Sequence, residues 1–467
     1  MRAFTAIVKQ TVRSAVRSHV FHVLGVLILL AVFLLPVTVS GDGTAAGQLQ
    51  IAITYSLGVV VALISTTTLW LSCALLSREV ETYSLHLVTT KPCPRWLIWV
   101  GKWFGVFLMH VMILFASAAV ILALVLWRTS RADFPGAEVQ RLHSEVMVGR
   151  RAFRPEPPPF TEMVDKEYRR RLPELDKAHD PKTVRNEILR QLVASSGEVA
   201  PGGQRFWEFR NVRISDPREP LFVRYRLYSG STGQSDQKEV PGVWLVRDPK
   251  STDQDRFFPV TESEKALGGA FHELRVDPAF VGEDGRLILG YLNPPAETGA
   301  WGALKPMPVM FQIADGPSVL VRVTGFAANY ARSLLLAVFQ IGFLAALGCM
   351  VGAAFSTPVA AFVAISYLII GMAVRAAVDA PLRDDLGNYQ YKGKLEMVTH
   401  RFAQAVSAAV VSVDEMDTTS DLARGRLIEW RRIGSDLLRL IVVRAGLIAA
   451  FGMWVLTRRE LGTVIRR

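Results

Sequence analysis

The sequence predicts an α-helical polytopic membrane protein with six transmembrane helices and an inserted extracytoplasmic α+β domain that contains an antiparallel β-sandwich. Three observations support this prediction. Half of the 467 residues are hydrophobic (50%) and only 20% are charged, which is too apolar for an ordinary soluble chain. The charges are concentrated outside several long uncharged runs. A large polar middle region contains short segments typical of strands.

Six apolar runs are long enough to cross a membrane. A transmembrane helix needs about 20 apolar residues to cross about 30 Å of hydrocarbon. The runs are residues 20–39, 51–76, 103–127, 333–356, 358–374 and 440–457. Gly342, Gly348 and Gly352 interrupt the fourth run at intervals of four to six residues, as expected where helices pack closely.

Residues 1–19 are expected to form an amphipathic helix at the membrane surface. Lys9, Arg13 and Arg17 follow each other at intervals of four residues and therefore lie on one face of a helix, opposite an apolar face. The apolar run that follows is too long for the hydrophobic region of a signal peptide. We therefore expect a first transmembrane helix that is retained.

The basic residues of the short loops predict the orientation, because cytoplasmic loops contain an excess of Lys and Arg. With six spans, the N-terminal tail, the loop after the second span and the C-terminal tail fall on the same side. Their basic residues are Arg2, Lys9, Arg13, Arg17, Arg78, Lys91, Arg95, Lys102, Arg458, Arg459, Arg466 and Arg467. The sequence therefore predicts a multi-pass protein of the cytoplasmic (inner) membrane, with both termini cytoplasmic.

These spans divide the chain into five segments. They are residues 1–127 (N-terminal amphipathic helix, transmembrane helices 1–3 and a cytoplasmic coupling loop), 128–330 (extracytoplasmic domain), 331–380 (transmembrane helices 4 and 5), 381–438 (extracytoplasmic amphipathic helices) and 439–467 (transmembrane helix 6 and cytoplasmic tail). The amphipathic patterns at 395–413 and 421–438 predict two helices. These helices lie either on the outer leaflet or against the extracytoplasmic domain.

The extracytoplasmic domain begins with helical patterns and continues with strands. Charged amphipathic segments from Thr161 onwards and over 180–193 predict helices. Short segments rich in β-branched and aromatic residues predict strands at 205–212, 221–228, 243–247, 287–292 and 319–323. Asp284-Gly285 is typical of a hairpin turn. Several short strands with such turns favour an antiparallel β-sandwich.

The absence of several motifs argues against several classes of function. The chain contains no GxxxxGK[ST] Walker A motif, so we expect no ATP hydrolysis by this chain. It contains no HExxH, GxSxG or metal-spaced Cys/His cluster, and we predict no catalytic residue, metal site or enzyme activity. His272-Glu273 is expected at an exposed strand flank. Because Cys73, Cys93 and Cys349 lie in or beside apolar runs, no disulfide framework is expected in the polar middle.

The net charge of +11 does not indicate nucleic-acid binding. Much of the excess lies beside the apolar runs, where membrane topology requires it. No basic motif interleaved with aromatic residues is present. We therefore expect no nucleic-acid partner.

One polar stretch, residues 78–102, separates the second and third spans with the sequence REVETYSLHLVTTKPCPRWLIWVGK. Its second half places Trp96 and Trp99 beside Arg95 and Lys102. Aromatic and basic residues of this kind anchor short helices at a membrane surface. The stretch is therefore expected to lie at the cytoplasmic surface of the membrane.

This stretch resembles the cytoplasmic loop of the type-2 ABC transporter permease family, the integral membrane subunits of ABC exporters. The matching elements are Arg78-Glu79-Val80-Glu81-Thr82, Ser84-Leu85, Lys91-Pro92, Arg95, Gly101-Lys102, the entry-helix residues Ile7, Arg13 and Arg17, and the tail Arg458-Arg459-Glu460-Leu461-Gly462. Tyr83 stands where the family usually has glycine. The large insertion between spans three and four lies outside the minimal family pattern.

The resemblance implies the permease subunit of an ABC exporter, working as a homodimer or heterodimer of permeases. It implies a separate ABC ATPase subunit that binds ATP and Mg, with no cofactor on this chain. The residues implied to couple to the ATPase are Arg78, Glu79, Glu81, Leu85, Leu87, Lys91, Pro92 and Arg95. Apart from the resemblance, Leu85, Leu87 and Trp96 offer a partner an apolar anchor, and the two acids offer it charge.

Three charged residues in or beside the spans are further candidates. Arg444 lies inside the sixth run, and such a residue faces a cavity, a partner or an ion path. Alternatively it extends outward to the membrane surface together with Arg439. Arg375 and Asp379 end the fifth run at an i, i+4 spacing that allows mutual neutralisation. Asp379 is also the nearest candidate partner of Arg444.

A second hypothesis is a membrane-anchored extracytoplasmic binding or sensor protein without transport activity. In that case the β-sandwich performs the function and no ATPase partner is expected. In the first hypothesis the same domain guides the substrate or recruits an envelope partner. Membrane lipid is a partner in both.

Overall fold

The computed structural model describes residues 2–35, 45–82, 93–131, 135–156, 158–174, 180–229, 239–251, 256–260, 264–295, 307–313, 315–379, 394–412, 417 and 419–459. The chain forms two compact units. The first, the helical unit, comprises Met1–Gly149, Thr324–Ala380 and Val398–Arg467. The second, the sheet unit, comprises Arg150–Val323 and Pro381–Met397.

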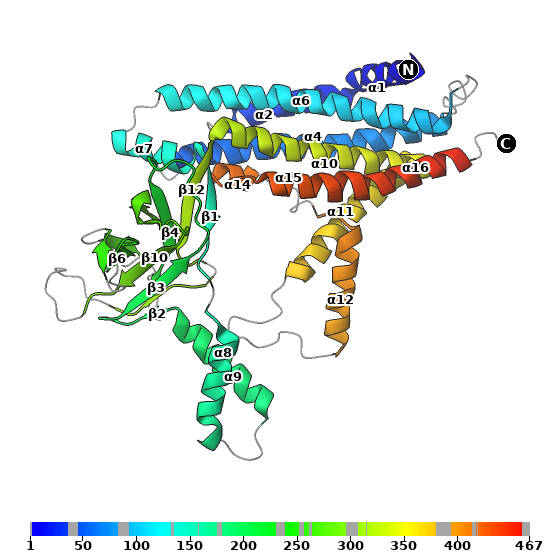
Figure 1. The fold of residues 1–467 in the computed structure, drawn as a ribbon. Helices are drawn as coiled ribbons and strands as arrows, with labels where there is room; N and C mark the ends of the chain where they lie inside the picture. The colour runs from blue at the N-terminus through cyan, green and yellow to red at the C-terminus, as the bar shows by residue number, and fades with distance from the viewer. Residues whose placement is uncertain are drawn as a thin grey trace. The chain divides into compact units, whose positions relative to one another are not determined.

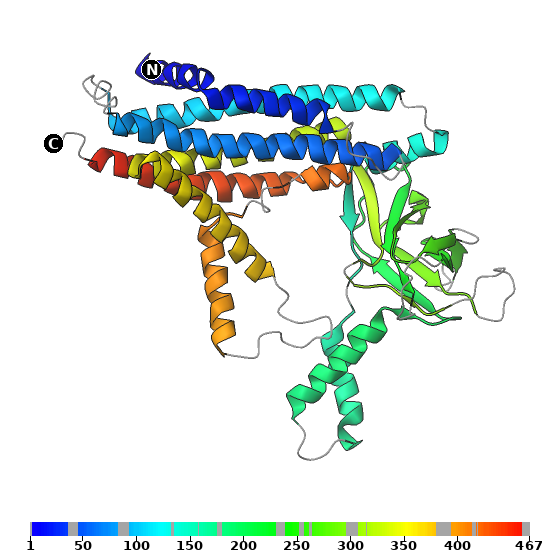
Figure 2. The ribbon, with the colours of Figure 1, turned by 180° about the vertical axis from the view of Figure 1, so that it is seen from behind.

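In the helical unit the longest helices run side by side (Figures 1 and 2). The helices of the unit are α1 (Arg2–Val16), α2 (His19–Phe33), α4 (Ala45–Glu81), α6 (Arg95–Arg131), α7 (Gly136–Glu145), α10 (Phe326–Ala354), α11 (Thr357–Asp379), α12 (Lys394–Ala409), α14 (Thr419–Ala423), α15 (Trp430–Asp436), the π-helix η4 (Leu437–Ala445) and α16 (Gly446–Arg458). The last three are continuous. They form one helix, Trp430–Arg458.

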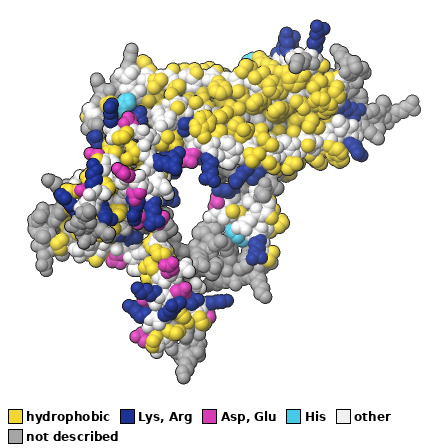
Figure 3. Space-filling model, in the orientation of Figure 1, with side chains coloured by type: hydrophobic (Ala, Val, Ile, Leu, Met, Phe, Trp, Pro, Cys, Tyr) yellow, Lys and Arg dark blue, Asp and Glu magenta, His cyan; other side chains and the backbone are white. Residues whose placement is uncertain are grey.

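Within the described residues, five helices are long and apolar enough to cross a membrane. A sixth is added if α1 and α2, which are bent by 65° at their junction, count as one span. Figure 3 shows hydrophobic side chains gathered over the surface of the helical unit. Phe362 and Leu447 are 72% and 68% exposed, as suits side chains that face lipid. The chain thus combines five to six apolar helices, compatible with membrane spans, with a separate antiparallel sheet region.

Helix α10 is the centre of the helical unit and packs against α4, α6, α11 and α16. Two of its glycines permit close contact with α4. A Cβ atom on Gly348 would lie 1.9 Å from Ser72 Oγ, and one on Gly352 would lie 2.6 Å from the carbonyl oxygen of Cys73. Close helix packing at these two glycines is therefore confirmed. Around Gly342 the nearest atoms are 3.4 Å away, which is ordinary contact.

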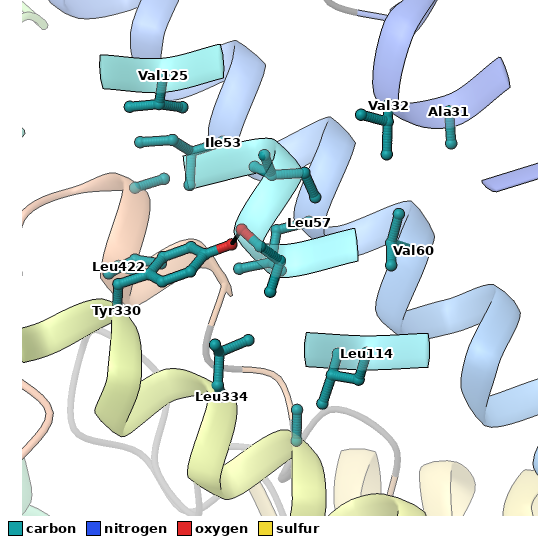
Figure 4. Close-up of a cluster of buried hydrophobic side chains, with 14 of the residues drawn as sticks. Ala31, Val32, Ile53, Leu57, Val60, Leu114, Val125, Tyr330, Leu334 and Leu422 are labelled. Atoms are coloured by element: carbon teal, nitrogen blue, oxygen red, sulfur yellow. Dashed lines mark hydrogen bonds between the residues drawn. The ribbon is translucent and has the colours of Figure 1, made fainter. Parts of the chain in front are cut away.

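A large apolar cluster joins α2, α4, α6 and α10 at one end of the unit (Figure 4). Tyr330 of α10 points into this cluster, and its hydroxyl donates to the carbonyl oxygen of Ala118 at 2.9 Å. The polar end of the tyrosine is therefore paired inside an otherwise apolar environment, as a buried hydroxyl requires.

The single helix expected over 421–438 is wrong. The chain turns after α14, where Gly425 has a φ of +63°, a conformation that favours glycine. The segment that follows is fixed to α10 by the buried amide of Asn329, which donates to Arg426 O at 2.7 Å and accepts from Ile428 N at 2.9 Å. The last helix then begins at Trp430, well before the expected start of the sixth run.

The sheet unit contains antiparallel strands, as the sequence predicts. They are β1 (Val148–Phe153), β2 (Glu198–Val199), β3 (Gln204–Phe209), β4 (Leu221–Arg226), β5 (Tyr228–Ser229), β6 (Glu239–Arg247), β7 (Phe257–Pro259), β8 (Glu264–Leu267), β9 (Phe271–Val276), β10 (Leu287–Leu292), β11 (Val309–Met310) and β12 (Ser318–Gly325). Their sheet orders are β1-β12-β4-β9, β3-β10-β6-β7 with β8 beside β6, and β2-β11-β5. Each of the five expected strands coincides with one or two of these.

Aromatic side chains join the sheets in one core. The ring of Tyr225 on β4 lies 4.6 Å from that of Trp244 on β6, although the two strands belong to different sheets. Phe311 lies edge-on to both Trp207 and Tyr291, with ring centroids 5.0 Å apart in each case. Such contacts add to the stabilisation from buried area.

Two local expectations in the sheet unit are wrong. Asp284-Gly285 forms a turn in which Gly285 has a φ of +74°, but the turn connects β9 to β10, which lie in different sheets, and so it closes no hairpin. His272-Glu273 lies within β9 instead of at an exposed flank. Glu273 accepts hydrogen bonds from Nη1 and Nη2 of the buried Arg150, at 2.6 and 3.0 Å, so its position is set by an ion pair between distant segments.

Two helices, α8 (Phe160–Arg171) and α9 (Pro181–Ser196), pack against each other in the sheet unit. Both were expected from their amphipathic pattern. Asp180 caps α9 by accepting from the Lys182 amide at 3.1 Å, and Pro181 is the first helical residue. This is a common way for a helix to begin.

Candidate coupling site at one end of the helical unit

The residues predicted to couple to an ATPase lie where several helices end. Helix α4 finishes at Glu81, α6 begins at Arg95 and α16 finishes at Arg458; we call this the Glu81 end. Four of the predicted residues are described, namely Arg78, Glu79, Glu81 and Arg95. The other four, Leu85, Leu87, Lys91 and Pro92, lie in the segment 83–92, outside the described residues, as does Tyr83.

Glu79 links α4 to α6. Its Oε1 accepts from Nζ of Lys102 at 2.5 Å, and the Lys102 side chain is only 5% exposed. A buried ammonium group is stable only when it is paired and hydrogen-bonded. Glu79, which was expected to contact a basic residue of a partner, is therefore paired with a lysine of the same chain.

Glu81 links α4 to α11. Its Oε1 accepts from the backbone N–H of Thr357 at 2.9 Å, at the first residue of α11. The N–H groups of the first helical turn have no partner within the helix, and a carboxylate there also interacts favourably with the helix dipole. Glu81 thus caps a helix far away in sequence.

Arg95 links α6 to the end of α16. Its Nη1 donates to the carbonyl oxygens of Thr457 and Arg459, both at 3.0 Å. Arg459 in turn donates to Ala353 O in the last turn of α10. The last carbonyl groups of a helix lack partners within it, and a cation there is favourable. Two helix ends are therefore capped by arginines from other segments.

Ser77 and Trp99 complete the contacts of this end. The Ser77 hydroxyl donates to Gly352 O at 3.2 Å and to Phe355 O at 2.9 Å. Trp99 is 1% exposed, so its expected role as a surface anchor is wrong. It packs against Gly452 of α16, where a Cβ atom would lie 2.9 Å from its Nε1. Trp96, by contrast, is 50% exposed.

Sequence reasoning missed Ser77 and Thr357, and only Thr357 had a signal. Thr357-Pro358 is typical of the start of a helix, since proline favours the first turn. Nothing in the sequence pairs that start with Glu81, because the two residues lie in different spans. Within the described residues, no group of three or more His, Cys, Asp or Glu lies close enough to hold a metal ion.

Of the three charges in or beside the spans, Arg375 and Asp379 pair with each other as expected, and Arg444 binds a carbonyl oxygen instead of Asp379. Asp379 accepts from Nε of Arg375 at 2.5 Å, as the i, i+4 spacing predicts. Nη2 of Arg444 donates to the carbonyl oxygen of Ser407 in α12 at 3.0 Å. Arg375 and Arg444 nevertheless line the same cavity.

In comparisons with known proteins, no family model, curated protein or solved structure matches the chain.

Proposed function

We propose that this chain is the permease subunit of an ABC exporter, that it acts in the cytoplasmic membrane with both termini cytoplasmic, and that a separate ATPase subunit drives it. One observation supports the proposal most strongly. Both flanks of the predicted coupling segment 83–92 bind other helices, through Glu79 and Glu81 on one side and Arg95 on the other. A displacement of this segment is therefore transmitted to α6, α11 and α16.

The mechanism follows from these links. Closure of the ATPase pair, with ATP and Mg bound to it, pushes on the segment 83–92. Since the flanks are fixed by a buried ion pair and by helix caps, the helix ends move with the segment rather than past it. The helices then shift between two packed arrangements, which is how a small displacement produces a larger conformational change. A homodimer or heterodimer of permeases places two such ends beneath two ATPase subunits.

The test is copurification of the tagged full-length protein from its own membrane in mild detergent. We expect a chain with a Walker A motif to copurify and to hydrolyse ATP. The variant Leu85→Ala/Leu87→Ala should lose at least about tenfold of this ATPase, because apolar anchors dominate interface energies. The matched control is Val23→Ala/Val26→Ala, which truncates two side chains of α2 that are each 57% exposed.

Two results would oppose the proposal. In the first, no chain with a Walker A motif copurifies with the wild-type protein. In the second, the Leu85→Ala/Leu87→Ala variant retains this partner and its ATPase activity. Charge reversal at Glu79 is a poorer test. It would leave Lys102 buried without its acid, so that a loss of ATPase would also follow from misfolding.

The second candidate is a membrane-anchored binding or sensor protein. The observation that favours it is the independent core of the sheet unit, which is built from its own aromatic residues. In that case the wild-type protein purifies without an ATPase, and the leucine variant behaves like the wild type. The same copurification therefore separates the two candidates.

A further inference from the structure

A cavity of about 370 Å³ lies within the helical unit between α11, α12 and η4. Three of the residues that line it are arginines: Arg375 of α11 and both Arg439 and Arg444 of η4. Ser407 and Ser412 add polar groups to the wall. Three guanidinium groups around one cavity concentrate positive charge on helices that are otherwise apolar, and such charges pair with a partner or a ligand.

The π-helix explains how two of these arginines reach the same cavity. In an α-helix, residues five apart are separated by about 140° around the axis. The i→i+5 hydrogen bonds of a π-helix bring such residues onto nearly the same face. Gly446 N–H donates to Ile441 O, five residues earlier. Arg439 and Arg444, also five residues apart, therefore face one cavity instead of diverging.

The opposite wall is fixed by a close backbone contact. Gly371 of α11 is buried, and a Cβ atom on it would lie 2.2 Å from the carbonyl oxygen of Val411. Only glycine permits this approach of the chain that follows α12. The contact holds the two serine-bearing segments beside α11, so the cavity is a built feature of the fold.

The cavity lies about one membrane thickness from the Glu81 end, measured along the helices. Arg375 lies 18 residues from Thr357, and Arg439 lies 18 residues from Thr457. Both helix ends belong to the Glu81 end, and 18 residues correspond to about 27 Å. This is close to the full thickness of the hydrocarbon layer, about 30 Å. The exposed side chains of Val442, Val443 and Leu447 beside it suit the apolar part of an amphiphile.

We propose that this cavity binds a phosphate group, as the anionic headgroup of a membrane amphiphile or as a free anion. Guanidinium groups bind phosphate with paired, charge-assisted hydrogen bonds. Asp379 neutralises Arg375, whereas no carboxylate among the described residues pairs with Arg439. Arg439 is also exposed, so it is free to contact the ligand first. The site does not depend on an ATPase partner.

The test uses the full-length protein in neutral detergent and native mass spectrometry with two lipids, phosphatidylglycerol and phosphatidylcholine. We expect phosphatidylglycerol to bind more tightly, and Arg439→Gln to weaken it about tenfold, as for the loss of one charged hydrogen bond. Arg444→Gln should do the same. Arg444→Gln loses the hydrogen bond to the Ser407 carbonyl oxygen. If this variant does not fold, the Arg439→Gln variant alone tests the proposal, because Arg439 is exposed.

Arg431→Gln is the matched control, since Arg431 is an exposed arginine of the same helix that does not line the cavity. It should bind phosphatidylglycerol like the wild type. Inorganic phosphate distinguishes the sources: competition by millimolar phosphate supports a free anion, and no competition supports a lipid headgroup. The proposal is overturned if the wild type binds phosphatidylglycerol no better than phosphatidylcholine and does not bind phosphate. It is also overturned if Arg439→Gln and Arg431→Gln lose the same affinity for phosphatidylglycerol.

Discussion

Lys102 and Glu79 form an ion pair of 2.5 Å between α6 and α4, with 5% and 23% of their side chains exposed. Glu79 lies in the last turn of α4, and Lys102 lies about two turns after the start of α6. The pair fixes the positions from which the predicted coupling segment departs and returns.

Lys102→Met should lower the free energy of unfolding by about 3 kcal/mol, because it leaves a partly buried carboxylate without its cation. The double variant Glu79→Gln/Lys102→Met should lose less stability than Lys102→Met alone, since no charge is left unpaired. Thermal unfolding in detergent of the two single variants, Glu79→Gln and Lys102→Met, and of the double variant measures the coupling. Equal losses in Lys102→Met and in the double variant would show that the unpaired carboxylate carries no cost.

Gly348→Leu and Gly352→Leu should separate α4 from α10 and cost about 3 kcal/mol each, the upper part of the range for overpacking. Their Cβ atoms would meet Ser72 and the backbone of Cys73, and the backbone cannot move aside cheaply. Gly25→Ala is the control, because no atom lies within 4 Å of a Cβ there and alanine favours a helix. The same thermal unfolding assay should find it unchanged or more stable.

Asn329→Ala should release the segment 426–428 from α10. The amide makes two hydrogen bonds to backbone groups of this segment, and each buried group left without a partner costs about 1–3 kcal/mol. Hydrogen exchange of the Ile428 amide should become faster. Unchanged exchange would show that the segment is held by its apolar contacts alone.

The stability of the sheet unit should fall in acid partly through Glu208. Hydrogen bonds from Arg210 and Arg286 lower the pKa of Glu208. A carboxylate with a lowered pKa in the folded state stabilises that state above its unfolded-state pKa, about 4.3. This contribution is lost as the pH falls through the folded-state pKa.

Glu208→Gln should therefore unfold at a lower temperature than wild type at pH 7, and the difference should shrink towards pH 3. Glu239→Gln, which removes an exposed carboxylate of β6, is the control for general acid effects. A difference between wild type and Glu208→Gln that stays constant with pH would contradict this assignment.

Hydropathy and periodicity were sufficient for the long apolar helices and for the five strands expected from the sequence. The apolar runs lie in the long helices, and the β-branched segments lie in the strands, because burial of these side chains is what stabilises them. Helix ends were less predictable. Helix α4 continues through Arg78 and Glu79 to Glu81, since the charged residues there form helices readily and Glu79 is paired with Lys102.

The partners of the candidate site residues were not predictable from one sequence. Glu81 and Thr357 are separated by 276 positions, and no local pattern connects an acid at the end of one helix to the start of another. The π-helix η4 was missed for a related reason. Its sequence, LLRLIVVRA, has the composition of an ordinary apolar helix, and nothing in it marks the change to i→i+5 hydrogen bonds.

The three thiols of the chain provide a built-in topology reporter. Cys73 and Cys349 are each 1% exposed, whereas Cys93 is half-buried immediately before α6, at the edge of the predicted coupling segment. A membrane-impermeant maleimide should therefore label the unmodified protein at one position only. Labelling in inverted vesicles, but not in right-side-out vesicles, would place the Glu81 end in the cytoplasm without a single substitution.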